Sequence, residues 1–150
     1  MALGTIADVA DLNRQNRILV RHGLKVLSEG QRTGIVALKK IAGLAPESVV
    51  TSEDIAFSLA PRMNAAGRVK HASVVVDMLL STNPDHAYEY ASTLESLNRE
   101  RKDIENTMIQ QAEEMFVESV NKGYNGLVLA HDNWHPGVAG IVASRIVEKT

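Results

Sequence analysis

The feature that decides the fold is a loop-to-helix junction, DNWHPGVAGIVASR at residues 132–145. A short apolar run bounded by turn residues precedes it at 126–130, and this run predicts a buried strand. Apolar residues recur at helical spacing from Ile141 to Val147 and predict a helix. Pro136 and Gly137 stand where that helix would begin, and proline is tolerated there because no helical N–H is lost.

The predicted helix start is rich in small residues, which let a backbone or a ligand approach closely. Its free N–H groups and the positive end of its dipole favour an anion. Arg145 adds a fork of donors suited to phosphate. An equally open interpretation is that the small residues only permit tight packing, and that Arg145 is a solvated surface charge.

Four motifs occur in a fixed order along the chain: LGTIADV at 3–9, APRMNAAGR at 60–68, NRER at 98–101 and WHPGVAGIVASR at 134–145. Together they resemble the RecJ family of single-strand-specific exonucleases, within the DHH phosphoesterase superfamily. The resemblance spans essentially the whole chain. Several ordered motifs at plausible spacing are far more specific than one glycine-rich loop.

The amino-acid composition restricts the class of protein to which this chain can belong. The 150 residues are 45% hydrophobic and 23% charged, with a formal net charge of −2. The chain has no overall positive charge of the kind that indicates nucleic-acid binding, so any contact with DNA must involve a local group of basic residues. Cysteine is absent, which excludes disulfides and thiolate metal sites and fits an intracellular protein. No apolar run approaches the roughly 18 residues of a membrane span, and no secretory signal is apparent.

The N-terminal part predicts a strand end followed by helices. Residues 3–8 are apolar and end in Asp8, as at the carboxyl end of a parallel strand. Asn13 caps a predicted helix through Glu29, and a second helix runs from Thr33 to Gly43. We expect the buried residues of the first of these helices to be Ile18, Leu19, Leu24, Val26 and Leu27.

A second chemically interesting stretch lies at residues 61–70. A capping-box start at 51–54 predicts a short helix that Pro61 ends. The following small residues predict a compact loop, with Asn64 holding it through side-chain to backbone bonds. Arg62, Arg68 and Lys70 cluster there. They are either solvated arginines and lysine or a phosphate clamp, and the resemblance favours the clamp for Arg68.

A helix predicted at Ser73–Leu80 is followed by a much longer one. Asn83, Pro84 and Asp85 supply a cap, a first-turn proline and a first-turn acid. No Gly or Pro interrupts the chain until Gly123, so one helix of about 38 residues is predicted, about 57 Å long. Its apolar positions fall three or four apart, at 87, 91, 94, 97, 104, 108, 112, 115 and 116. Its midsection, 98–103, is polar all round, which suits a helix that bridges two domains.

The predicted fold is therefore a mostly α-helical piece of an α/β parent. The resemblance implies that residues 1–82 are the C-terminal part of a DHH catalytic domain, 83–122 a connecting long helix, and 123–150 the start of a DHHA1 domain. A lone strand at either end cannot form a sheet. We therefore expect the chain to be an internal fragment, and to be inactive by itself.

The resemblance, rather than spacing, implies the chemistry. Such enzymes hold two divalent ions, Mn²⁺ or Mg²⁺, that activate water for phosphodiester hydrolysis. They degrade single-stranded DNA from its 5′ end in recombination and repair. Asp8 matches the last catalytic motif and would be the catalytic metal ligand present. Candidate DNA-binding residues are Asn64, Arg68, His135, Ser144 and Arg145. A single-strand-binding protein and a helicase are possible partners, in the cytoplasm, and no membrane is involved.

Three alternatives remain open. Another DHH phosphodiesterase, acting on oligoribonucleotides or cyclic dinucleotides, would share the architecture, although the wording of the motifs favours the RecJ family. A non-catalytic replication scaffold would lack a complete metal site, and Asp8 argues only weakly against it. A metal site at His131 and His135 would use their spacing of four, but Pro136 breaks a shared helical face and no third ligand is nearby.

Overall fold

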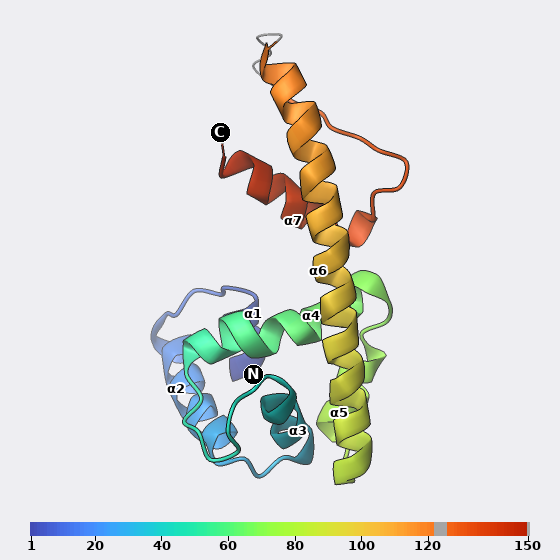
Figure 1. The fold of residues 1–150 in the computed structure, drawn as a ribbon. Helices are drawn as coiled ribbons and strands as arrows, with labels where there is room; N and C mark the ends of the chain where they lie inside the picture. Colours follow the sequence, from blue (N-terminus) through green and yellow to red (C-terminus); the bar gives the residue numbers. More distant parts are fainter. Residues whose placement is uncertain (122–125, 150) are drawn as a thin grey trace. The chain divides into compact units, whose positions relative to one another are not determined.

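The computed structural model describes residues 1–121 and 126–149, and every regular element in those ranges is a helix (Figure 1). In order these are α1 (Ala2–Ala7), α2 (Arg14–Ser28), α3 (Thr33–Ile41), the π-helix η1 (Asp54–Leu59), α4 (Ala60–Val69), α5 (Ser73–Leu80), α6 (Pro84–Asn121) and α7 (Pro136–Val147). The chain forms two compact units, Met1–Asn98 and Arg99–Thr150, and the boundary falls inside α6. The predicted mostly helical fold is confirmed.

The first unit is built on the start of α6. Its buried side chains are mostly aliphatic and include Leu38, Ile55, Leu59, Met78 and Leu94, each fully inaccessible to solvent. Two alanines of α6, Ala87 and Ala91, face the same core. α3 packs on α5 at very close range, because a Cβ at Gly34 would stand 2.1 Å from the Met78 carbonyl oxygen.

The N-terminal segment corrects one prediction. Residues 2–7 form the helix α1, not the end of a strand. A strand needs a partner, whereas a helix places Leu3, Ile6 and Ala7 together on the core. Ala2 is buried against α2, where a Cβ at Gly23 would stand 2.4 Å from the Cβ of Ala2.

Helix α2 begins where predicted, with the Asn13 side chain accepting the N–H of Asn16 at 3.2 Å. Gly30 follows it with a φ of +63°. The predicted buried face is largely wrong: Val20 is the residue of α2 that is buried, and Leu24 and Leu27 are half-buried. Ile18, Leu19 and Val26 are exposed.

The segment between α3 and η1 is fixed by a buried lysine. Lys39 is fully inaccessible to solvent, and its Nζ donates to the carbonyl oxygens of Pro46 at 2.6 Å and Ser48 at 3.1 Å. Ser28 at the end of α2 accepts the Val50 N–H on its Oγ at 2.9 Å. A buried ammonium group requires such acceptors, so these contacts define the path of residues 46–50.

The predicted capping box is confirmed at Thr51 and Asp54. The Thr51 N–H and Oγ1 both donate to Asp54 Oδ2, at 2.9 and 2.8 Å, and the Asp54 N–H donates back to Thr51 Oγ1 at 3.1 Å. These bonds lower the pKa of Asp54 below its usual value, and the charge of Lys39 adds to the effect. The helix that starts here passes through Pro61, which was predicted to end it.

The wide turn of η1 explains how the helix continues past a proline. Pro61 has no N–H, and in an α-helix its ring would crowd the carbonyl group four residues earlier. A π-helical turn bonds one residue further back: the Ala60 N–H donates to the Ile55 carbonyl oxygen. Residues 60–69 therefore form α4, and the loop predicted around Asn64 is wrong.

Helix α6 confirms the predicted long helix. It runs without interruption over 38 residues, through the polar midsection at 98–103. Asn83 caps it by accepting the N–H groups of Asp85 and His86. All nine predicted apolar positions are buried or half-buried. The midsection is not solvated on every side, since Asn98 is only 1% exposed.

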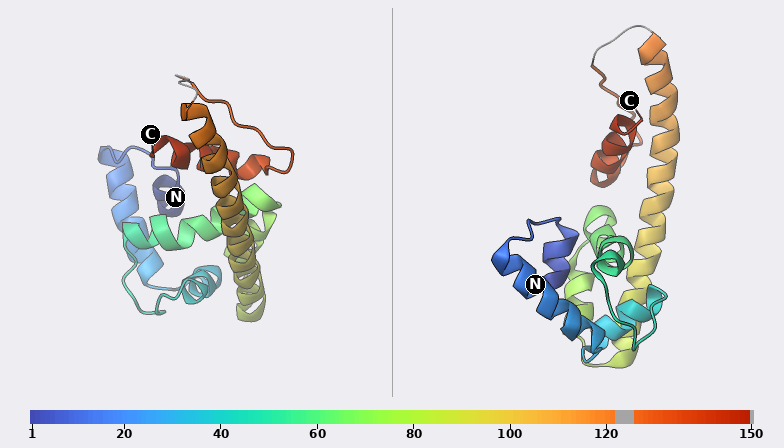
Figure 2. Two further views of the ribbon diagram at one scale, coloured as in Figure 1. Left: turned by 45° about the horizontal axis from the view of Figure 1, so that its top comes forward. Right: turned by 90° about the vertical axis from the view of Figure 1, so that its left-hand side faces the viewer.

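The second unit packs α7 alongside the later turns of α6 (Figure 2). Val138, Val142 and Ile146 stand four residues apart on one face and meet Met108 and Ala112 of α6. The predicted strand at 126–130 is wrong, since no strand is present in the described ranges. Within the described ranges, residues 126–130 have no neighbouring strand with which to pair, and Val128 is 95% exposed.

Within the described residues, no helix combines the length and the apolar composition that crossing a bilayer requires. Helix α6 is long enough but carries many charges.

We expect Gly34→Ala to lower the free energy of unfolding by about 1–3 kcal/mol, because the new Cβ must push Met78 away. Urea unfolding measures the effect. Gly4→Ala is the matched control in a helix of the same unit, where a Cβ meets no atom within 4 Å. The control should be neutral or stabilise by up to about 1 kcal/mol. Equal effects of the two substitutions would contradict the close approach of α3 and α5.

Because its pKa is lowered in the folded state, Asp54 stabilises the fold when it is ionised. Its contribution should be complete above its unfolded-state pKa of about 3.9 and should disappear as pH falls through the lower folded-state pKa. Asp54→Asn should therefore cost about 0.5–1 kcal/mol at neutral pH, and progressively less as the carboxylate is protonated in acid. Urea unfolding across pH tests this, with Glu53→Gln as a control at the exposed neighbouring position. A difference that persists unchanged into acid would contradict the role of the carboxylate.

Candidate functional site

Asp8 lies in the turn at the end of α1. It is exposed and caps the helix, with its N–H donating to the Gly4 carbonyl oxygen at 3.0 Å. Val9 follows with a φ of +51°, an unfavourable conformation for a β-branched residue. The Ala10 N–H donates to the Thr5 carbonyl oxygen at 3.0 Å and holds the turn. Strain of this kind is often found beside functional residues.

The carboxylate of Asp8 is a chemically suitable ligand for Mg²⁺ or Mn²⁺. A two-metal centre needs several such ligands. Residues 1–121 and 126–149 contain no group of three or more His, Cys, Asp or Glu side chains that could hold a metal ion. Asp8 is therefore not part of such a group within the described residues.

Asn64 and Arg68 lie on α4 rather than on a loop. Both are exposed, and Arg68 is in the last turn, near the negative end of the helix dipole. The neighbouring Arg62 has a structural role. Its Nε donates to Glu95 Oε2 at 2.6 Å, and its Nη1 donates to the Ser58 carbonyl oxygen at 2.6 Å. Arg62 is therefore engaged with both α6 and η1.

His135 is the N-cap of α7. Its Nδ1 accepts the Gly137 N–H at 3.1 Å, and Pro136 takes the first position of the helix, as predicted. The loop before it is tied to α6 by Trp134, whose Nε1 donates to Gln111 Oε1 at 2.8 Å. Trp134 is half-buried against the core of the second unit.

The alternative metal site at His131 and His135 gains no support. The Nδ1 atom of each ring accepts a backbone N–H, from Asn133 and Gly137 respectively. The His131 ring also stacks on Trp134, with centroids 6.3 Å apart. No third ligand of a metal cluster is present among the described residues.

Ser144 and Arg145 stand in the last turns of α7, not near its start. Nine or ten residues separate them from His135, or about 15 Å along the helix axis. The predicted combination of an anion at the helix start with the Arg145 guanidinium therefore fails on geometry. Ser144 Oγ donates to the Gly140 carbonyl oxygen at 3.2 Å, within its own helix.

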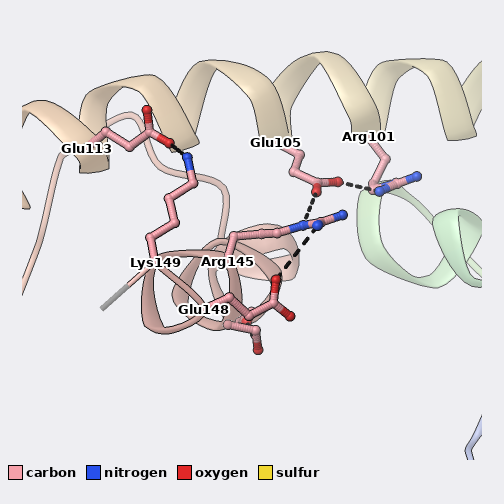
Figure 3. A network of polar contacts seen from close by, with 8 residues as sticks. Arg101, Glu105, Glu113, Arg145, Glu148 and Lys149 are labelled. Atoms are coloured by element: carbon pink, nitrogen blue, oxygen red, sulfur yellow. Dashed lines mark hydrogen bonds and ion pairs between the residues drawn. The ribbon is translucent and has the colours of Figure 1, made fainter.

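Arg145 belongs to a charged network that joins α7 to α6 (Figure 3). Its Nε lies 3.8 Å from Glu105 Oε1, and its Nη1 lies 3.8 Å from Glu148 Oε2. Glu105 Oε2 accepts from Arg101 Nη1, one turn earlier on α6. The Arg145 side chain remains 58% exposed, whereas those of Glu105 and Arg101 are 9% and 13% exposed.

Sequence reasoning missed Glu105, although a signal was available. Residues 101, 105, 108 and 112 continue the apolar stripe of α6 at steps of four and three, so a glutamate at 105 must face a core. A buried carboxylate requires cationic partners, and Arg101 and Arg145 provide them.

The predicted site residues fall into two sets. Asp8, Asn64 and Arg68 belong to the first unit, and His135, Ser144 and Arg145 to the second. The described side chains offer one carboxylate suited to a metal and exposed arginines suited to phosphate. They do not assemble a complete catalytic centre.

Comparison with known proteins gives a consistent result. The chain is 44% identical to the single-stranded-DNA-specific exonuclease RecJ of Salmonella typhimurium and 42% identical to that of Escherichia coli. Each match covers 99% of this chain and 26% of the relative. The chain thus spans about a quarter of the length of these curated relatives. No protein-family model matches the sequence.

Solved structures agree. RecJ from Thermus thermophilus in complex with Mn²⁺ matches 99% of this chain with a TM-score of 0.85 and 35% identity, over 22% of that structure. An exonuclease RecJ bound to manganese gives a TM-score of 0.84 at 35% identity, over 37% of that structure. Nearly the whole chain is therefore similar, in sequence and in fold, to one segment of the RecJ exonucleases.

Proposed function

We propose that this chain is the part of a metal-dependent exonuclease for single-stranded DNA that carries one metal ligand and part of the DNA-binding surface. The observation that carries the proposal is the match to RecJ over 99% of the chain, at up to 44% identity. Because the chain spans about a quarter of those relatives, the activity belongs to the whole protein in which the sequence works.

The domain organisation is part of the proposal. Residues 1–82 would close a catalytic DHH domain, 83–122 would form the connecting helix, and 123–150 would begin a DHHA1 domain. The division of the chain into two compact units within α6 supports a helix that serves two domains. Residues 122–125, where the second domain would begin, lie outside the described residues.

The proposed cofactor is Mn²⁺ or Mg²⁺. Solved RecJ structures in complex with each of these ions support this choice. Asp8 would be one ligand in the whole protein, and the bound ions would supply an activated water for hydrolysis. The chain's own contribution is to hold that carboxylate on a turn fixed by backbone bonds.

The finer features of the proposal follow from the resemblance. Degradation would proceed from the 5′ end in recombination and repair, in the cytoplasm. A single-strand-binding protein and a helicase are the proposed partners. Arg68 and Arg145, with Asn64, His135 and Ser144, would contact the DNA backbone. Contacts with phosphate do not depend on sequence, which suits an enzyme that degrades any strand.

We expect the isolated chain to release no nucleotides from 5′-labelled single-stranded DNA with Mn²⁺, because one carboxylate cannot hold two metal ions. In the whole protein, Asp8→Asn should lower kcat by at least about a hundredfold. Asp11→Asn, at an exposed position three residues later, is the matched control and should retain activity. Appreciable hydrolysis by the isolated chain, abolished by Asp8→Asn, would contradict its role as a part.

Arg68→Ala and Arg145→Ala should each weaken binding of single-stranded DNA by the whole protein, equally for all sequences. Loss of one phosphate contact should flatten the dependence of log K on log salt concentration by about 0.7. Titrations across salt, with Ca²⁺ replacing the catalytic ions, measure both effects. Arg14→Ala, at an exposed position on α2, is the control. Unchanged affinity and slope in both variants would assign these arginines to structure or to solvent.

A further inference from the structure

We propose that Glu105 is a positioning residue that holds Arg145 for DNA phosphate, and that Glu148 is an exchangeable counter-ion that the phosphate displaces. This inference rests on the proposed function. It concerns two side chains, Glu105 and Glu148, that the resemblance does not assign to any role, and both lie within the second unit.

The two acids beside Arg145 differ in their surroundings. Glu105 comes from α6, and its side chain is 9% exposed, whereas that of Glu148 is 69% exposed. Glu148 lies three residues after Arg145 on the same helix. A buried carboxylate cannot leave its partners without a large desolvation cost, while an exposed ion pair exchanges with water at little cost. Glu105 is therefore fixed, and Glu148 is replaceable.

The two oxygens of Glu105 are divided between two arginines. Oε2 accepts from Arg101, which is nearly buried, and Oε1 faces the Nε of Arg145 (Figure 3). Electrostatic attraction across this 3.8 Å separation draws the Nε side of the guanidinium group toward α6. Arg145 Nη1 faces Glu148 at the exposed end of the group. A phosphate oxygen can occupy the place of the Glu148 carboxylate and accept from the same donors.

Charge balance supports the exchange. Arg101, Glu105, Arg145 and Glu148 sum to zero charge, since two cations face two anions. When Glu148 moves into water and a phosphate takes its place, the buried part of the network keeps its charges and its contacts. The exchange therefore requires no rearrangement of α6.

Replacing Glu105 and replacing Glu148 should have opposite effects on the affinity for single-stranded DNA. Simple electrostatics predicts that deleting any negative charge near DNA strengthens binding. Positioning predicts that Glu105→Gln weakens binding of single-stranded DNA, by about three- to tenfold, because Arg145 loses its support. Glu148→Gln should strengthen binding by about twofold, because the competitor is removed. Glu113→Gln deletes the same charge eight residues further along α6, where Glu113 pairs with the exposed Lys149, and should change affinity by less than about twofold.

The deciding experiment is a double-mutant cycle in the whole protein, with 5′-labelled single-stranded DNA titrated across salt in Ca²⁺. In the Arg145→Ala background, Glu105→Gln should have no further effect on affinity, because it acts through Arg145. Thermal unfolding of each variant measures stability in parallel. The exposed Glu148→Gln variant tests the exchange even where Glu105→Gln lowers stability.

Three outcomes would overturn the proposal: tighter binding by Glu105→Gln, the same weakening with and without Arg145, or weaker binding by Glu148→Gln. Failure of the proposed function is distinguishable, because the unmodified whole protein would then neither bind nor degrade single-stranded DNA.

Discussion

The structure depends on the apolar residues of α6, which enter the core of each unit. In the first unit they include Ala87, Ala91, Leu94 and Leu97, and every one of them is buried in the core. In the second unit they include Met108 and Ala112. The same helix therefore supplies part of the core of each unit.

Ion pairs connect this helix to a neighbouring helix in each unit. Glu95 holds Arg62 of α4, and Glu105 faces Arg145 of α7, so a carboxylate of α6 contacts a neighbouring helix in each unit. Partly buried pairs of this kind contribute little net stability, because desolvation offsets their attraction. They do fix which groups face each other. In the second unit that selection concerns a side chain with a proposed role in DNA binding.

The sequence predicted the helices with long periodic patterns and clear caps, notably α2 and α6. It failed where short segments fit more than one structure. Residues 3–8 and 126–130 are apolar runs too short to distinguish a strand from a helix or an extended segment. The exposed face of α2, with Ile18 and Val26, shows that periodicity predicts an apolar face without saying what covers it.

The candidate site was predictable residue by residue but not in its geometry. Motif resemblance pointed to Asp8, Arg68 and Arg145. It could not show that Arg68 lies on a helix, since the effect of Pro61 depends on the π-helical turn before it. That turn also sets the rotation of α4 about its own axis. The π-helical turn contains one residue more than an α-helical turn, and this residue rotates the side chains of α4 by about 100°. The side of α4 on which Arg62 contacts Glu95 therefore depends on that one extra residue.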